Sequence, residues 1–156
     1  MKKIYLWFLL AGLFTSLGGC SKDFLKNYED RIDDGTWELY DVDHWGAGSN
    51  MGLSFTGGFF QFDPSGQLHY KDDAGNEYEG TWNMDWKEVN GSCTTDDNGN
   101  TTCTNRTVRT LQLAVVSFQT REMLTDYFDE ILFTGTDRFR AYIYTQYKTH
   151  VFYFKR

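Results

Sequence analysis

The chain has 156 residues, a net charge of −7 and only one proline, and 28 of its residues are aromatic. This length allows one domain with a real hydrophobic core and is too short for two ordinary ones. The acidic balance argues against binding to nucleic acid and against docking on anionic lipid by charge, while the aromatic, glycine, asparagine and aspartate content favours a β-sheet protein.

The first twenty residues follow the pattern of a secretory signal peptide. Two lysines form a positive start, residues 4–14 are almost entirely apolar, and two glycines precede Cys20. The apolar run is shorter than the roughly 20 residues that a membrane-spanning helix needs, so an uncleaved span is the weaker interpretation. The Leu-Gly-Gly-Cys ending resembles the lipobox of bacterial lipoproteins. This resemblance implies that residues 1–19 are removed and that Cys20 carries the lipid anchor, including an amide-linked chain such as palmitate.

The residues after Cys20 bear on the location of such a lipoprotein. Serine rather than aspartate at position 21 favours the outer membrane, and Ser21–Asp23 loosely resembles the export tag of surface-displayed lipoproteins in some Gram-negative bacteria. The mature chain would have 137 residues, and its charge would change from −7 to −9 because Lys2 and Lys3 are lost. We therefore expect a lipid anchor, and not charge, to hold the protein in the cell envelope.

Residues 20–34 are expected to form the lipidated N-terminus and a tether. Phe24, Leu25, Tyr28 and Ile32 recur at roughly helical spacing, so this segment is either a short helix or a solvated linker. Fourteen extended residues would reach about 45 Å, far enough to hold a domain clear of the lipid headgroups. The domain itself is expected over residues 35–156.

From Gly35 onward, apolar and polar residues alternate with period two between turn signals, which indicates antiparallel strands. Short connections favour an all-β, up-and-down barrel over two stacked sheets, because closure removes the exposed sheet edges. Residues 119–127 are open to three interpretations: a helical turn, an added strand segment or a lid. The eight predicted strands are 36–43, 53–62, 67–72, 77–88, 106–118, 128–135, 138–146 and 149–155.

Cys93 and Cys103 are left as a pair once Cys20 is acylated. An oxidising envelope favours a disulfide between them, and the Asn98–Gly99 turn signal midway predicts a long hairpin stapled across its own strands. Metal ligation is the alternative, although no histidine lies nearby in the sequence. The acidic run over residues 96–100 lacks the downstream glutamate of a calcium loop, so we interpret it as a turn.

The first predicted strand opens with Gly35-Thr36-Trp37, and a second Gly-x-Trp, Gly80-Thr81-Trp82, follows an Asp-Pro-Ser-Gly turn. These features resemble a lipocalin-like domain, in which the first Gly-x-Trp packs its indole across the barrel floor. The resemblance implies this structural role for Gly35 and Trp37. Thr125-Asp126-Tyr127 matches a second signature of the family, and Arg138 would be the arginine that stacks on the floor tryptophan.

Two functions are compatible with such a barrel. In the first, the barrel interior holds a small apolar or amphipathic ligand. The candidate residues that line it are those that the alternation of apolar and polar residues places on an apolar strand face. In the second, the aromatic side chains fill the interior, and the barrel binds a glycan or an envelope protein through exposed Trp45, Tyr142, Tyr144 and Tyr147. The candidate lining is Phe55, Phe59, Tyr78, Trp82, Met84, Trp86, Leu111, Leu113 and Phe139.

The sequence contains no recognisable enzyme motif: no Gly-x-Ser-x-Gly, no His-Glu-x-x-His, no phosphate-binding glycine loop and no spare cysteine. His44, His69 and His150 lie on or beside separate predicted strands. They would form a metal or haem site only if closure of the barrel brought them together, and three unrelated polar histidines are the simpler interpretation. We therefore expect no catalytic residue, no metal and no cofactor.

Overall fold

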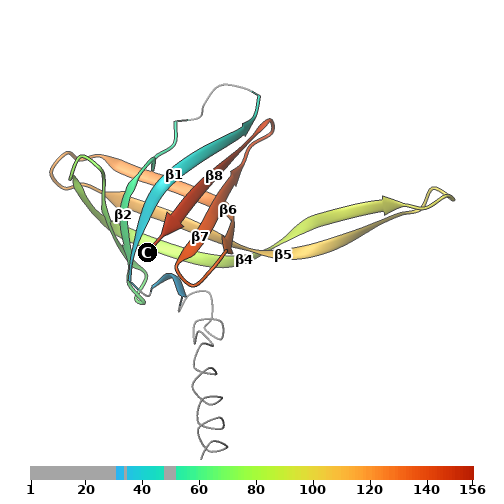
Figure 1. Cartoon of the computed structure of the whole chain (residues 1–156), viewed down its shortest axis with the longest axis horizontal. Coiled ribbons are helices and arrows are strands. Elements are labelled where there is room, and N and C mark those ends of the chain that lie inside the picture. Colours follow the sequence, from blue (N-terminus) through green and yellow to red (C-terminus); the bar gives the residue numbers. More distant parts are fainter. Residues whose placement is uncertain (1–30, 34, 48–51) are drawn as a thin grey trace, which may run out of the picture.

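The computed structural model describes residues 31–33, 35–47 and 52–156, which form a closed barrel of eight antiparallel strands (Figure 1). Each strand pairs with the next along the chain, and β8 pairs with β1 to complete the ring. The predicted all-β, up-and-down eight-stranded fold is confirmed. The strands are β1 (Thr36–Gly46), β2 (Gly58–Phe62), β3 (Gln67–Lys71), β4 (Glu77–Thr95), β5 (Thr101–Val116), β6 (Met123–Phe133), β7 (Arg138–Tyr144) and β8 (Lys148–Lys155).

Three hairpin turns share one local design. In each, a glycine N–H donates to the carbonyl of an aspartate three residues earlier, and the glycine has a positive φ that other residues rarely adopt. The aspartate carboxylate also accepts hydrogen bonds from side-chain and backbone groups of residues in or just after the turn, and these bonds lower its pKa. These turns are Asp63–Gly66, Asp72–Gly75 and Asp96–Gly99.

Aromatic rings fill the barrel from end to end. Trp37 contacts Phe139, with ring centroids 4.7 Å apart, and Phe139 stacks on Phe154 at 4.3 Å. Phe154 meets Phe60 at 5.5 Å, and Phe60 meets Phe55 at 5.3 Å. All five side chains are buried. This unbroken series of rings makes the interior a packed core, as small eight-stranded barrels allow.

The floor of the barrel is closed by Ile32 and Trp37. Ile32 is fully buried, and its carbonyl accepts a hydrogen bond of 2.6 Å from the Trp37 indole N–H. Arg156, and not the predicted Arg138, lies over the Trp37 ring at 4.9 Å. Arg31 donates to the Gly135 carbonyl at 2.6 Å and lies over the Phe133 ring. Residues 31–33 therefore pack as part of the barrel and not as tether, so the domain begins before Gly35.

The opposite mouth is crossed by residues 52–57, which connect β1 to β2. Phe55 is buried at its centre, its N–H donates to the Asp126 carboxylate at 3.3 Å, and Ser54 Oγ donates to the Thr125 carbonyl at 2.7 Å. Burial raises the pKa of Asp126. The predicted strand 53–62 is therefore too long, because its first five residues cover the mouth. Residues 123–127 of the ambiguous segment belong to β6, as the added-strand alternative predicted, whereas residues 118–120 form a turn closed by a hydrogen bond from the Arg121 N–H to the Ser117 carbonyl.

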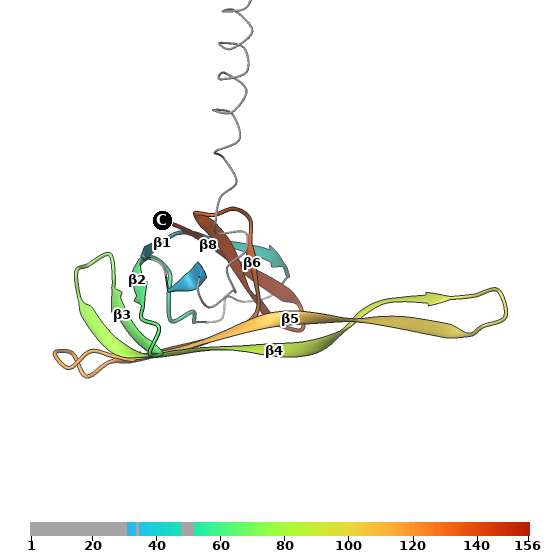
Figure 2. The same cartoon turned by 90° about the horizontal axis from the view of Figure 1, so that it is seen from below.

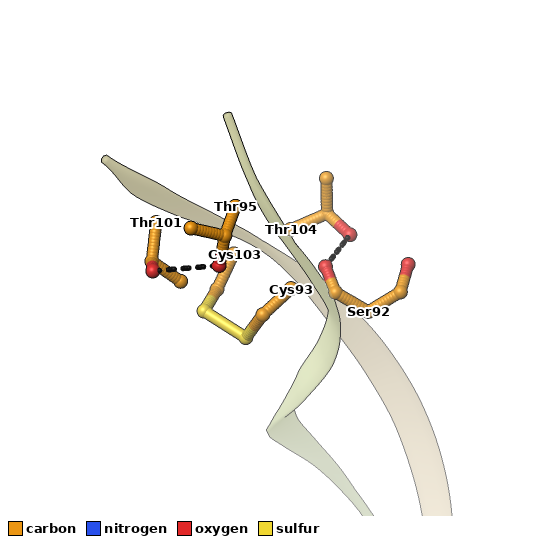
Figure 3. The surroundings of a disulfide bond; sticks show 6 residues. All are labelled: Ser92, Cys93, Thr95, Thr101, Cys103 and Thr104. Atoms are coloured by element: carbon orange, nitrogen blue, oxygen red, sulfur yellow. Dashed lines mark hydrogen bonds between the residues drawn. A yellow bond between two sulfur atoms is a disulfide. The ribbon is translucent and has the colours of Figure 1, made fainter. Parts of the chain in front are cut away.

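Beyond the barrel, β4 and β5 continue as a two-stranded arm over residues 90–105 (Figures 1 and 2). The predicted disulfide between Cys93 and Cys103 is confirmed and joins directly opposite residues (Figure 3). Hydroxyl contacts flank it: Thr95 and Thr101 lie 3.0 Å apart, and Thr104 donates to the Ser92 carbonyl at 3.2 Å. Almost every arm side chain is exposed. The arm is therefore held together by the backbone hydrogen bonds between β4 and β5 and by the disulfide, and not by a hydrophobic core.

The double substitution Cys93→Ser and Cys103→Ser is expected to loosen the arm and leave the barrel intact. A two-stranded ribbon without a hydrophobic face is marginal alone, and such a segment opens locally without global unfolding. Amide hydrogen exchange should accelerate at residues 92–104, while the melting temperature stays within about 2 °C of the wild-type value. A large drop in melting temperature would show instead that arm and barrel unfold as one unit.

Candidate functional site

A pocket of about 160 Å³ lies on the outside of the barrel, where the arm leaves it. We call it the arm-root pocket. One wall comes from β4 and β5 as they extend past the barrel, and the other comes from β6 and β7. Chain segments far apart in sequence meet there because β5 and β6 are neighbours in the closed sheet. Its lining residues are Lys87, Val89, Asn90, Arg106, Val108, Asp129, Glu130 and Tyr144.

A charged network fixes the centre of the arm-root pocket. Both terminal nitrogens of Arg106 donate to the two carboxylate oxygens of Glu130, each at 2.8 Å, and the Tyr144 hydroxyl donates to the same carboxylate at 2.8 Å. The Glu130 side chain is only 13% exposed. Desolvation and the Glu130 charge raise the pKa of Tyr144 to about 12, and the pKa of Arg106 is raised by Glu130. Tyr144 therefore stays protonated and Arg106 stays charged near neutral pH.

A second pair of charges borders this network. Lys87 Nζ lies 3.7 Å from Asp129 Oδ1, and Asp129 Oδ2 accepts the backbone N–H of Tyr144 at 2.9 Å. Two cations therefore face two carboxylates, so the arm-root pocket is close to neutral although the protein is acidic. Neutrality combined with fixed donors and acceptors suits a polar, uncharged ligand.

Exposed aromatic rings adjoin the arm-root pocket. Tyr144 stacks on Tyr142 with centroids 5.9 Å apart, and Tyr144 and Trp45 flank Thr149 from the two strands beside it. Trp45, Tyr144 and Tyr147 are exposed, and Tyr142 is half-buried. The sequence singled out these four residues, which we call the aromatic strip, and the structure places Trp45, Tyr142 and Tyr144 on one outer face.

A second outer pocket, of about 300 Å³, surrounds Phe59 on β2, β3 and β4. Its ion pairs are solvent-exposed: Lys71 lies 3.5 Å from Glu77, and His69 lies 3.9 Å from Glu79. Exposed pairs of this kind contribute little and hold their side chains loosely. The arm-root pocket is the better candidate because its carboxylate is preorganised.

Seven of the nine proposed lining residues do point into the barrel, but they pack there as core. Phe59 and Trp86 are the exceptions, 47% and 55% exposed. Phe59 faces outward because the alternation begins at Gly58 and not at residue 53. Trp86 lies where β4 leaves the barrel, and the Arg109 guanidinium covers its ring at 3.3 Å. The buried or half-buried seven are Phe55, Tyr78, Trp82, Met84, Leu111, Leu113 and Phe139.

The three histidines do not converge. His44 and His150 face each other across β1 and β8, whereas His69 lies on β3 beside Glu79. Within the described ranges, no three histidine, cysteine or acidic residues are grouped closely enough to hold a metal ion. Burial lowers the pKa of His150.

No protein-family model, curated protein or solved structure matches the chain. Among the described residues, no helix is long and apolar enough to cross a membrane. Cys20 and the signal-peptide pattern lie outside the described residues.

Proposed function

We propose that the protein is a lipid-anchored binding module of the bacterial outer membrane, tethered through Cys20, whose barrel is a rigid scaffold and not a ligand container. The series of rings from Trp37 to Phe55 supports the scaffold role, because it occupies the space that an internal ligand would need. Ten residues lie between Cys20 and Arg31, so the chain between these two residues reaches at most about 40 Å. The tether is thus shorter than the sequence alone suggested.

The resemblance to lipocalin-like lipoproteins forms part of this proposal. It is supported by the position of Trp37 at the barrel floor and by the up-and-down ring of strands. Asp126, from the Thr-Asp-Tyr match, binds the segment that covers the mouth. Arg156 takes the stacking position that the resemblance assigned to Arg138.

The ligand class that best suits the arm-root pocket is a neutral glycan. Sugar hydroxyls donate and accept hydrogen bonds at once, and Arg106, Glu130 and Asn90 offer both kinds of partner. The flat, apolar faces of sugar rings pack on exposed aromatic side chains such as Tyr144 and Trp45. The observation that carries the proposal is the fixed Arg106–Glu130–Tyr144 network beside these rings. We assign the site no catalytic step, because both carboxylates are already paired with cations.

The test is affinity electrophoresis of the full chain in detergent, through gels containing dextran, galactomannan, xylan or mixed-linkage β-glucan. We expect at least one of these neutral polysaccharides to retard the wild-type protein, and Tyr144→Ala to weaken that binding at least tenfold. Tyr40→Ala is the matched control, since Tyr40 is 45% exposed and Tyr144 is 46% exposed, both on the outer face.

Three results would contradict the proposal. One is that none of the four polysaccharides retards the chain. Another is that Tyr40→Ala and Tyr144→Ala weaken binding equally. The third is that Phe59→Ala abolishes binding while Tyr144→Ala does not, which would place the site in the pocket on β2, β3 and β4.

A further inference from the structure

Two histidines meet where β1 and β8 pair, on the face of the sheet opposite the one that carries Trp45 and Tyr144. His44, near the end of β1, and His150, near the start of β8, are direct cross-strand partners, so their side chains share one face of the sheet. Their Nδ1 atoms lie 2.9 Å apart, and their ring planes are inclined by 76°. His150 is buried and His44 is exposed, so one ring is fixed by packing while the other can turn.

We propose that His44 and His150 chelate one divalent transition-metal ion through their Nδ1 atoms. Ligand nitrogens lie about 2.0–2.1 Å from such an ion, so two of them are about 2.9 Å apart when they subtend a right angle and about 3.4 Å apart at the tetrahedral angle. The Nδ1–Nδ1 separation of 2.9 Å, set here by a hydrogen bond, equals the spacing of two nitrogen ligands at the right angle of a tetragonal site. Cu²⁺ prefers that geometry, binds imidazole well and forms the most stable complexes of the first-row divalent ions.

The chelate forms without a net change in protonation. In the metal-free pair, one Nδ1–H donates to the lone pair of the other Nδ1. An ion takes both lone pairs, so the donor ring moves its proton from Nδ1 to Nε2 and both rings remain neutral. In the hydrogen bond the two Nδ1 atoms point at each other, so binding an ion requires the rings to turn until both lone pairs converge on it, and the exposed His44 ring is the freer of the two to turn. No third histidine, cysteine or acidic ligand joins the pair in the described chain, so the remaining positions would be filled by water.

The test uses the full chain in detergent, expressed without a polyhistidine tag, and Cu²⁺ as the probe. Isothermal titration should give one Cu²⁺ per chain at the pair, and the electron paramagnetic resonance spectrum should show nitrogen ligands. His44→Gln should weaken this binding at least tenfold, because a single remaining imidazole is no chelate. His69→Gln is the matched control and should leave the affinity unchanged. Ni²⁺ and Zn²⁺ should bind more weakly than Cu²⁺.

A second readout does not depend on a substitution at either ligand. Trp45 follows His44 directly in the chain and is exposed, so a paramagnetic ion at the pair should quench its fluorescence. Saturable quenching that is lost in both Trp45→Phe and His44→Gln would support the site. Absence of Cu²⁺ binding at micromolar concentration, or equal binding by wild type and His44→Gln, would show that the two histidines form a hydrogen-bonded pair only.

Discussion

Replacing Trp37 with alanine is expected to lower the free energy of unfolding by about 3–5 kcal/mol, the usual cost of emptying the space of a buried large aromatic. Trp37 is fully buried, contacts Phe139 and Phe133, and donates its indole N–H to the Ile32 carbonyl. The substitution therefore opens a cavity and leaves a buried carbonyl without its partner. Because domains are stable by only about 5–15 kcal/mol, the melting temperature followed by near-ultraviolet circular dichroism should fall by about 10 °C or more.

Trp86→Ala is the control for Trp37→Ala. Trp86 is on the outside and interacts with the Arg109 guanidinium, so its loss should cost no more than about 1 kcal/mol. If the two substitutions destabilise the protein equally, Trp37 does not have the floor position that we describe.

The substitution Cys20→Ala is expected to release the protein from the membrane fraction. A lipid anchor contributes about 0.8 kcal/mol for each methylene group that enters the bilayer, and two chains give stable attachment. Without an acceptor cysteine no chain can be added. Metabolic labelling with an alkyne analogue of palmitate should mark the wild-type protein and not the variant, and cell fractionation should move the variant to the soluble fraction.

The double substitution Cys93→Ser and Cys103→Ser is the control for Cys20→Ala. It removes the other two cysteines and should keep both the label and the membrane attachment. Retention of Cys20→Ala in the membrane, or an unlabelled wild-type protein whose N-terminus still carries residues 1–19, would argue against the lipoprotein interpretation.

The sequence predicted the fold because the barrel follows local rules. Alternation at period two places Trp82, Leu111 and Phe139 inside, and aspartate–glycine turns connect neighbouring strands in order. The errors occur where a residue's position depends on contacts with distant parts of the chain, which the local alternation of apolar and polar residues does not encode. Residues 53–57 alternate like a strand but bind β6 across the mouth, and β4 continues past the barrel, where Trp86 has no core to face.

The arm-root pocket was less predictable than the barrel. Arg106 and Glu130 are 24 residues apart in the chain, and no sequence motif links them. Their pairing depends on the register of β5 against β6, which shifts at a bulge between Arg109 and Leu111. Of the residues at or near this pocket, only those of the aromatic strip could be predicted from the sequence, because the alternation of apolar and polar residues indicated that their side chains point outward. Similarly, Ile32 is buried beside Trp37, to which its carbonyl is hydrogen-bonded. The roughly helical spacing of Phe24, Leu25, Tyr28 and Ile32 did not predict that Ile32 packs into the barrel.

The most direct measurement of where a ligand binds is a pair of nuclear magnetic resonance titrations of the ¹⁵N-labelled full chain in detergent. One uses oligosaccharide fragments of the polysaccharide that retards the protein in the gel, and the other uses a water-soluble short-chain fatty acid. We expect the oligosaccharide to shift amide signals of Asn90, Arg106 and Tyr144, and the fatty acid to leave Phe60, Leu113 and Phe154 unchanged. Saturable shifts of those three core residues with the fatty acid, and none at the arm root with the oligosaccharide, would show that the barrel is a container after all.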